Sequence, residues 1–393
     1  VMAIADPSDR FARVLLGLAV GDALGWPNER CSRVEKQILE SPPGGFPLWE
    51  MDRVRILPGE YSDDTQLTLA VARSLMSPRW EEHLSTAELP FLLRYQRGAG
   101  RATLEAARSW ARGVPPWLGV QGYVAAGGNG VVMRIAPHVM VGLVSGDLEG
   151  TLSRVFRDGL MTHGHPRALL GALCHAFCLW FLGVQGGGHE DLRSALVDQA
   201  GTWGRLREED LPPGWFPPGW DLGRYQLEWE SVLDAMLVQV ERMSLQWGPM
   251  EGLGELGGVG PRAGTGDATA LSALFLLGLH WDSPLEGLLL ASRLREGDPD
   301  TLASVLGALL GMRHRNGWIP EGLRGVQDQE CLLRTAAALG SGDPVGAARE
   351  LMGSSVEGQW RPSPIGEIRS LGTRDGLEKV QTRLGQTLYL AVV

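Results

Sequence analysis

The sequence contains little cysteine, and the spacing of the few residues present does not suggest bridges. Four cysteines occur among 393 residues, at Cys31, Cys174, Cys178 and Cys331, with no C-x-x-C pattern. A disulfide framework is therefore not expected in a chain of this length. Cys174, His175 and Cys178 raise the alternative of a zinc site. Thiols in an apolar helix usually pack as small hydrophobic side chains, so we favour packing over metal binding here.

An excess of basic charge is also missing. The chain has 36 Lys and Arg against 46 Asp and Glu, a formal net charge of -10. Stable non-specific nucleic-acid binding is therefore not expected, because it requires a basic face. The hydrophobic fraction of 44% is that of an ordinary folded protein, which excludes wholesale disorder.

Only one long hydrophobic run occurs, at residues 168–184, and its single ionisable residue is His175. The run reaches the lower length limit of a membrane span. The central histidine and the Pro166–Arg167 start favour a buried helix of a large helical domain instead. Residues 1–10 lack the charged-then-apolar pattern of a secretory signal. We therefore expect a cytoplasmic protein with no membrane partner.

Strand-like alternation is scarce, and helical periodicity dominates. From Ser8, a plausible N-cap, the apolar positions recur on one helix face, which Asp22 closes: Phe11, Val14, Leu15, Leu18 and Ala19. Further helices are predicted at 66–76, 86–96, 102–112, 149–157, 166–183, 225–243, 268–280, 284–294, 301–313 and 328–339. Residues 387–393 are the best strand candidate. The fold class predicted is all-α, with at most a minor C-terminal β element.

Glycine and proline are abundant, with 54 and 24 residues, but no short repeat carries them. Most lie between the predicted helices, and residues 201–224 form a Pro/Gly/Trp-rich insertion in which the tetrad PPGW occurs twice. Its Trp215 and Trp220 either cover a pocket or simply fill a surface groove, and we favour the groove. No linker divides residues 8–340, which we take as one domain, and residues 345–393 are predicted to be a C-terminal appendage.

Two short acidic motifs each precede a predicted helix. The first is Ser62-Asp63-Asp64-Thr65, and the second is Asp298-Pro299-Asp300-Thr301. Helix capping explains part of the pattern, since Ser, Thr and Asp are preferred N-caps and acids suit the helix dipole. One cap needs only one such residue, however, and each motif supplies two carboxylates and at least one hydroxyl.

A shared site for the two motifs and Asp22 would hold five carboxylates. Like charges at such distances must be protonated or neutralised. Hard divalent cations with oxygen ligands achieve this, and a pair of Mg²⁺ or Mn²⁺ ions suits this ligand set. The spacing along the chain does not establish that the motifs converge.

Five motifs together resemble the ADP-ribosylglycohydrolases, a family that includes the ADP-ribosyl-acceptor hydrolases and the dinitrogenase-reductase-activating glycohydrolase. They are G-x-x-x-G-D-A-L-G at 17–25, S-D-D-T at 62–65, G-G-N-G-x-x-M-R at 127–134, T-H-x-H at 162–165 and G-D-x-D-T at 297–301. Each motif alone is weak, but their order and spacing match over about residues 8–325.

The resemblance implies a compact domain of orthogonally packed helices that holds two Mg²⁺ or Mn²⁺ ions. The metal ligands it implies are Ser62, Asp63, Asp64, Asp298, Asp300 and Thr301. Asp22 would lie beside the metals, behind the direct ligands, and Glu29 matches a glutamate near the scissile bond in some members. The catalytic residues implied are Glu29, Asp63 and Asp300.

The substrate contacts implied by the resemblance lie on a glycine-rich loop and a histidine. Gly127, Gly128, Asn129 and Gly130 would wrap the diphosphate and ribose, and His163 would contact the substrate, with a local cap as its alternative role. Where the family usually has threonine, this chain has Pro299, at a position that is not a ligand. The glycine-rich approach to the helix at 268–280 follows the family pattern only loosely.

Arginines surround the predicted site. Met133 and Arg134 are expected to support the loop, with Arg134 paired to a buried acid. Arg94, Arg97 and Arg101 would form either a basic rim for phosphate or a solvated helix end.

The activity implied is hydrolysis of the glycosidic bond between ADP-ribose and its acceptor. The acceptor expected is a protein side chain, with a nucleic-acid base or a small molecule as alternatives, and the residues do not distinguish arginine, serine or other linkages. A non-catalytic ADP-ribose-binding protein on the same scaffold is the alternative function. A phosphohydrolase of the HD type is disfavoured, because none of the eight histidines is followed by aspartate.

Overall fold

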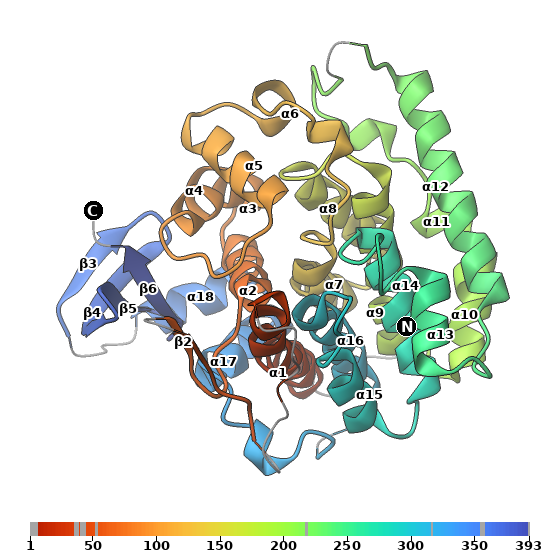
Figure 1. Ribbon diagram of the computed structural model, residues 1–393. Helices are drawn as coiled ribbons and strands as arrows, with labels where there is room; N and C mark the ends of the chain where they lie inside the picture. The colour runs from red at the N-terminus through yellow and green to blue at the C-terminus, as the bar shows by residue number, and fades with distance from the viewer. Residues whose placement is uncertain are drawn as a thin grey trace.

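Helices make up most of the structure, a computed structural model that describes residues 7–34, 39, 45–51, 54–216, 219–315, 317–353 and 358–391 (Figure 1). The α-helices are α1 (Pro7–Val34), α2 (Asp63–Leu75), α3 (Trp80–His83), α4 (Leu89–Leu92), α5 (Arg101–Ala111), α6 (Pro116–Gly119), α7 (Ala136–Ser145), α8 (Leu148–Leu160), α9 (Pro166–Val184), α10 (His189–Asp198), α11 (Ala200–Trp203), α12 (Leu222–Arg242), α13 (Pro249–Leu256), α14 (Gly266–Leu279), α15 (Pro284–Ala291), α16 (Pro299–Arg313), α17 (Gln329–Gly340) and α18 (Pro344–Gly353). The predicted helical fold class is confirmed.

A small sheet follows the last helix. Its four antiparallel strands lie in chain order: β3 (Trp360–Ser363), β4 (Gly366–Arg374), β5 (Leu377–Thr382) and β6 (Thr387–Ala391). β6 confirms the strand predicted at 387–393 as far as the described residues extend. A separate hairpin joins β1 (Trp49–Met51) and β2 (Val54–Ile56). The other strands were not predicted, because they expose much of both faces and so carry little alternation of apolar and polar residues.

The long helices α1 and α16 lie side by side in the middle of the molecule (Figure 1). α2, α9 and α14 pack against this pair, and α12 runs along one edge. The C-terminal sheet lies at the opposite edge, beside α17 and α18 (Figure 1). It is joined to the helices through β6, where Ala391 N donates to Arg94 O over 3.0 Å. The division into a domain at 8–340 and an appendage at 345–393 stays a prediction.

Glycine allows α1 and α16 to touch along their backbones. Gly17 and Gly21 are four residues apart on α1, so they lie on one face, opposite Gly307 and Ala303 of α16. A Cβ atom at Gly21 would lie 2.1 Å from Ala303 O, and one at Gly307 would lie 2.1 Å from Gly17 O. Side chains larger than hydrogen would separate the two helices here. These glycines therefore serve close helix packing.

α1 is longer than the sequence pattern indicated. It begins at Pro7, so Ser8 lies in its first turn and is not the N-cap that the sequence analysis expected. It also continues past Pro27 to Val34, although proline usually ends a helix. Glu29 therefore lies two turns after Asp22 on the same helix, and both are buried. The Pro/Gly/Trp-rich insertion packs Trp215 against Tyr225 in the interior, rather than leaving it in a surface groove.

The apolar helix α9 is a core helix, as predicted. Its length and composition would suffice for a membrane span, but 83% of its most apolar stretch of 18 residues is buried within the fold. Pro166 is its first residue, and His165 accepts a hydrogen bond from Arg167 N as the N-cap. Cys174, His175 and Cys178 are all buried in it as packing residues.

His175 makes the stability of this core depend on pH. Burial lowers its pKa to about 3, and its Nδ1 has no hydrogen-bond partner among the described residues. A histidine with a depressed pKa binds its proton mainly in the unfolded state. Its contribution to stability is therefore present above pH 6.5 and is lost as the pH falls toward 3.

The variant His175→Leu is expected to lose part of the acid sensitivity of folding. Between pH 7.5 and pH 5, the free energy of unfolding should fall by about 2 kcal/mol less in the variant than in the wild type, since each pH unit below 6.5 contributes about 1.4 kcal/mol. Urea unfolding at the two pH values measures this difference. An equal fall in both proteins would show that His175 is not neutral in the folded state.

Candidate metal centre and substrate pockets

The start of α2 is fixed by Asp22 from α1. Its Oδ1 accepts a hydrogen bond from Ser62 N at 2.8 Å, and its Oδ2 accepts from Thr65 N at 2.9 Å and Thr65 Oγ1 at 2.6 Å. Ser62 is the N-cap of α2, and its side chain accepts from Asp64 N. Both oxygens of Asp22 are thus used to position α2. This agrees with a place beside the metals and behind their direct ligands.

The two acidic motifs meet, although 237 positions separate the residues that join them. Thr301 Oγ1 donates to Asp64 Oδ1 over 3.3 Å, which links the start of α16 to the start of α2. Asp298 occupies the N-cap position of α16, but its side chain makes no capping hydrogen bond. Its Oδ2 instead accepts from Asn129 Nδ2 at 3.0 Å. Helix capping therefore explains Ser62 and does not explain Asp298.

Glu29 joins the acidic cluster from α1. One carboxylate oxygen each of Glu29, Asp298 and Asp300 lie within 4.8 Å of one another, a spacing suited to a shared cation. Because α1 continues through Pro27, Glu29 lies at the start of α16, beside Asp298 and Asp300. Its expected place near the scissile bond stays a prediction.

The electrostatics of the cluster fit a divalent metal centre. Burial raises the pKa values of Asp63, Asp64 and Asp300 well above the usual range, and the neighbouring carboxylates raise them further. Asp64 Oδ2 and Asp300 Oδ1 are buried and have no hydrogen-bond partner among the described residues. Among the described residues, no Lys or Arg forms an ion pair with Asp22 or with either acidic motif. Oxygen-rich, uncompensated acids of this kind match the ligand preference of Mg²⁺ or Mn²⁺.

A close approach of the chain covers Asp63 on one side. Asp63 N donates to Arg97 O over 3.0 Å, and a Cβ atom at Gly98 would lie 3.2 Å from Asp63 Oδ1. Gly98 has a φ of +103°, which favours glycine. The Arg97 guanidinium lies over the rings of Trp26 and Tyr389, at 5.5 and 4.6 Å. A residue of the C-terminal sheet thus helps to hold the segment that covers Asp63.

The glycine-rich loop lies on another side of the cluster. Asn129 N donates to Gly264 O at 2.9 Å, and Gly266 N donates to Gly127 O at 3.0 Å. The loop therefore pairs with the glycine-rich approach to α14, the segment that follows the family pattern only loosely. Asn129 connects this loop to the acidic cluster through its hydrogen bond with Asp298.

His163 lies beneath the loop. A Cβ atom at Gly130 would lie 3.1 Å from its Cε1, and one at Gly128 would lie 3.6 Å from its Nε2. Burial lowers the pKa of His163 to about 3, so the ring is neutral. Thr162 Oγ1 accepts from Arg134 Nη2 at 2.9 Å and lies 2.7 Å from His163 Nδ1, so the ring is held by a hydrogen bond on the side away from the loop. A substrate contact by His163 stays a prediction, and the capping role belongs to His165.

Arg134 anchors the loop as expected. It is fully buried, and its Nε donates to Asp158 Oδ1 at 2.8 Å. Its Nη1 donates to Gly130 O at 3.0 Å, so the ion pair is tied directly to the loop backbone. His138 Nε2 meets the other Asp158 oxygen at 2.8 Å.

Two pockets adjoin the acidic cluster. The first, which we call the loop-side pocket, has a volume of about 560 Å³ and is lined by Gly127, Gly128, Arg101 and Arg167 among others. The second, the sheet-side pocket, measures about 490 Å³ and is lined by Trp26, Arg30, Gly98 and residues of the C-terminal sheet. Arg94, Arg97 and Arg101, for which a basic rim for phosphate was one of two expectations, do not line a single pocket. Arg101 lines the loop-side pocket, and Arg94 and Arg97 line the sheet-side pocket.

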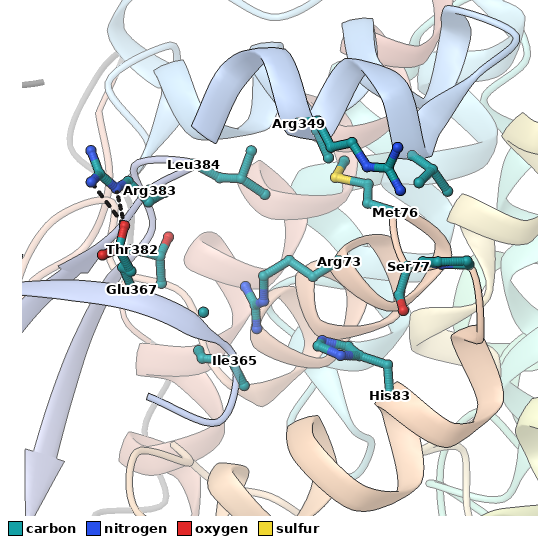
Figure 2. Close-up of a pocket in the computed structure, with 14 residues that line it drawn as sticks. Arg73, Met76, Ser77, His83, Arg349, Ile365, Glu367, Thr382, Arg383 and Leu384 are labelled. Carbon is teal, nitrogen blue, oxygen red and sulfur yellow. Dashed lines mark hydrogen bonds and ion pairs between the residues drawn. The ribbon is translucent and has the colours of Figure 1, made fainter. Parts of the chain in front are cut away.

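A further cavity lies away from the cluster, at the other end of α2. Its volume is about 300 Å³. Figure 2 shows Arg73 of α2 and Met76, the C-cap of that helix, across from Leu384, which follows β5, while Arg349 of α18 lies near Met76 and Arg383 is turned to Glu367. α2 has 13 residues, so this end lies about 20 Å from Asp63. The Arg73 guanidinium is already bound by Glu88, at 2.7 Å, and by Gln386. This cavity has no part in the acidic centre.

Comparison with known proteins identifies the family. The sequence pattern of the ADP-ribosylglycohydrolases matches residues 3–348, most of the chain. The chain belongs to the ADP-ribosylglycohydrolase family. A solved structure titled "ADP-ribosylglycohydrolase-related protein complex" is similar, with a TM-score of 0.58 and 26% identity over 86% of this chain and all of that one.

Two curated relatives in this family are named for one linkage. The ADP-ribosylarginine hydrolase Tri1 of Pseudomonas putida (strain GB-1) is 31% identical over 140 residues, which cover 33% of this chain and 35% of the relative. Tri1 of Serratia proteamaculans (strain 568) is 27% identical over 198 residues, covering 48% and 51%. The matches therefore span about a third and about half the length of these relatives.

Proposed function

We propose that this protein hydrolyses the N-glycosidic bond between ADP-ribose and an arginine side chain of an acceptor protein, and releases ADP-ribose. The observation that carries the proposal is the meeting of the two acidic helix starts, where Thr301 and Asp64 are hydrogen-bonded across 237 positions of sequence. Family membership supports the reaction class, and the names of the two curated relatives support the arginine linkage. A cytoplasmic location is part of the proposal.

Two divalent cations, Mg²⁺ or Mn²⁺, are part of the proposed enzyme. The residues that would hold them are Ser62, Asp63, Asp64, Asp298, Asp300 and Thr301, with Glu29 close enough to share one of them. Bound cations of this kind hold ribose hydroxyls and lower the pKa of water. The raised pKa values and the uncompensated buried oxygens described above support this assignment.

The protein groups have separate tasks in the proposed reaction. Asn129 orients Asp298 and ties the loop to the centre, and Asp22 holds the start of α2. The backbone of residues 127–130 offers a close approach to the diphosphate. Glu29 takes a proton from the attacking water, whose oxygen bonds to C1″ of the ribose as the bond to the guanidine nitrogen breaks. Glu29 returns this proton to the nitrogen as it leaves, so that free ADP-ribose and unmodified arginine result.

Release of ADP-ribose from different linkages tests the proposal. We expect Mg²⁺-dependent release from ADP-ribosylarginine at a rate at least about tenfold above that from serine-linked or nucleobase-linked ADP-ribose, because a misfitted leaving group loses alignment in the site. EDTA should abolish it. Calorimetric binding of ADP-ribose without release from any linkage would instead favour the non-catalytic binding protein.

A further inference from the structure

The sheet-side pocket carries a second inference, which rests on the proposed function. The pocket lies between four parts of the chain: the C-terminal half of α1, the segment 55–60 that begins in β2, the segment 93–98, and the part of the C-terminal sheet around Arg374 and Tyr389. β4 and β5 pair as far as Arg374 with Leu377, which places Arg374 at their turn, where its Nη2 donates to Arg55 O of β2. The pocket is therefore built jointly by the helices and the sheet.

Residues next to the acidic centre line both this pocket and the loop-side pocket. On one side, Asp298 is hydrogen-bonded to Asn129, next to the loop residues that line the loop-side pocket. On the other, Asp63 lies against Gly98, which lines the sheet-side pocket. A substrate whose ADP-ribose diphosphate follows the loop therefore extends its acceptor toward the sheet.

The sheet-side pocket is cationic, although the whole chain has a net charge of -10. Seven charged side chains line it, five basic and two acidic: Arg30, Arg55, Arg94, Arg97, Arg374, Glu60 and Asp375. A locally positive wall on an acidic protein attracts anionic partners and repels basic ones.

Two of these arginines are available to a partner. Arg97 and Arg374 both pair with Glu60, and Arg55 pairs with Asp375 at 3.5 Å. Within the described part of the chain, neither Arg30 nor Arg94 forms an ion pair, although the positive charge of Arg94 helps to lower the pKa of Glu378 on β5. Arg94 Nη2 donates only to the Ala391 carbonyl, at 3.3 Å, on the last described residue of β6.

Trp26 adds an unused donor at the same place. The residue is 6% exposed and lines the pocket, and its Nε1 has no hydrogen-bond partner among the described residues. Its Nε1 would lie 3.9 Å from a Cβ atom at Gly98, so the donor is also next to the segment that covers Asp63.

We propose that the sheet-side pocket binds the acceptor polypeptide on either side of the ADP-ribosylated arginine, and that it selects segments with aspartate or glutamate next to that arginine. Arg30 and Arg94 receive the carboxylates. The C-terminal sheet forms the outer wall of this acceptor site. A polypeptide is favoured over a nucleic acid because the remaining surface of a chain with net charge -10 repels an extended polyanion.

Binding can be tested without hydrolysis. Fluorescence anisotropy in EDTA would compare two fluorescein-labelled, unmodified peptides that differ only in carrying glutamate or glutamine around one arginine. We expect the wild type at 50 mM NaCl to bind the glutamate peptide about fivefold more tightly, and 500 mM NaCl to remove the difference. The double variant Arg30→Gln/Arg94→Gln should bind both peptides equally, whereas Arg108→Gln, an exposed arginine of α5, should keep the preference.

Equal binding of the two peptides by the wild type, or an unchanged preference in the double variant, would overturn the proposal. Tighter binding of a single-stranded oligonucleotide of the same charge would assign the pocket to nucleic acid and would overturn it too. With the ADP-ribosylated forms of the peptides, the ratio of their kcat/KM values should change in parallel. A wild type that prefers the acidic peptide but releases no ADP-ribose would leave this site in place and refute only the proposed hydrolysis.

Discussion

Asp300→Asn is expected to abolish hydrolysis and yet to stabilise the protein when metal is absent. The side chain is 4% exposed, and its Oδ1 has no hydrogen-bond partner among the described residues. Asparagine has nearly the same shape but removes one negative charge from the proposed ligand set. We expect kcat/KM for ADP-ribosylarginine to fall about 10³-fold, in line with the loss of one preorganised group at a reacting centre.

The sign of the stability effect follows from the pKa of Asp300. Burial, Glu29 and Asp298 raise that pKa well above 3.8. A carboxyl group whose pKa is raised in the folded protein stabilises the fold fully below pH 3.8. This stabilisation is lost as the pH rises through the pKa of the folded state. At pH 8 the metal-free wild type therefore carries a penalty that asparagine removes. One pKa unit corresponds to about 1.4 kcal/mol, so we expect the variant to unfold about 2 °C higher in EDTA.

Thermal unfolding in EDTA and in Mg²⁺ measures the stability half of this prediction, and ADP-ribose release measures the activity half. The wild type should be stabilised by Mg²⁺, and Asp300→Asn should be stabilised less, because ligand binding to the folded state raises the melting temperature. Asp234→Asn, an exposed acid on α12, serves as the control and should change neither value. A variant that is less stable than the wild type in EDTA, or that hydrolyses the substrate normally, would contradict the assignment.

A single methyl group at Gly21 is expected to destabilise the whole fold. In Gly21→Ala the new Cβ would lie 2.1 Å from Ala303 O, a backbone atom that cannot move without separating α1 from α16. Overpacking typically costs 1–3 kcal/mol, and a clash with backbone lies at the upper end, so we expect a loss of about 3 kcal/mol or more. Asp22 and Asp300 are carried by these two helices, so metal binding should fail as well.

A glycine in open space provides the matched control. Gly254 lies inside α13, and a Cβ atom there would meet no atom within 4 Å. Gly254→Ala should therefore stabilise the protein by about 0.5–1 kcal/mol, because alanine restricts the unfolded chain and favours the helix. Urea unfolding of the two variants beside the wild type gives both numbers. If Gly21→Ala unfolded at the same urea concentration as the wild type, the close packing of α1 and α16 would be wrong.

The helical part of the fold could be predicted because its signals are local. Apolar spacing identified helices such as α2 and α9, and Pro166 and Pro299 mark the starts of α9 and α16. The C-terminal sheet could not be predicted, apart from β6, because β3 and β4 are largely exposed on both faces and so lack an alternation of apolar and polar residues. The path of α1 was also missed, because Pro27 is a strong local signal for a helix end that tertiary packing overrides.

The acidic motifs of the site could be recognised from residue types, but their meeting could not. The hydrogen bond between Thr301 and Asp64 depends on the backbone contact of α1 with α16, and no local pattern encodes it. The contribution of the sheet could not be predicted for the same reason. The Tyr389 ring lies 4.6 Å from the Arg97 guanidinium, although the two residues are 292 positions apart in the sequence. The glycines at 17 and 21 were the available clue, because a four-residue spacing places them on one helix face.

A titration of the metal-free protein with Mn²⁺ tests the central claim most directly, if bound Mn²⁺ and ADP-ribose release from ADP-ribosylarginine are measured in the same samples. Electron paramagnetic resonance of free Mn²⁺ gives the number bound. The account predicts two Mn²⁺ per chain, with hydrolysis rising as they bind, and no more than one in Asp300→Asn. Full hydrolysis in the metal-free protein, or two ions bound equally by Asp300→Asn, would contradict it.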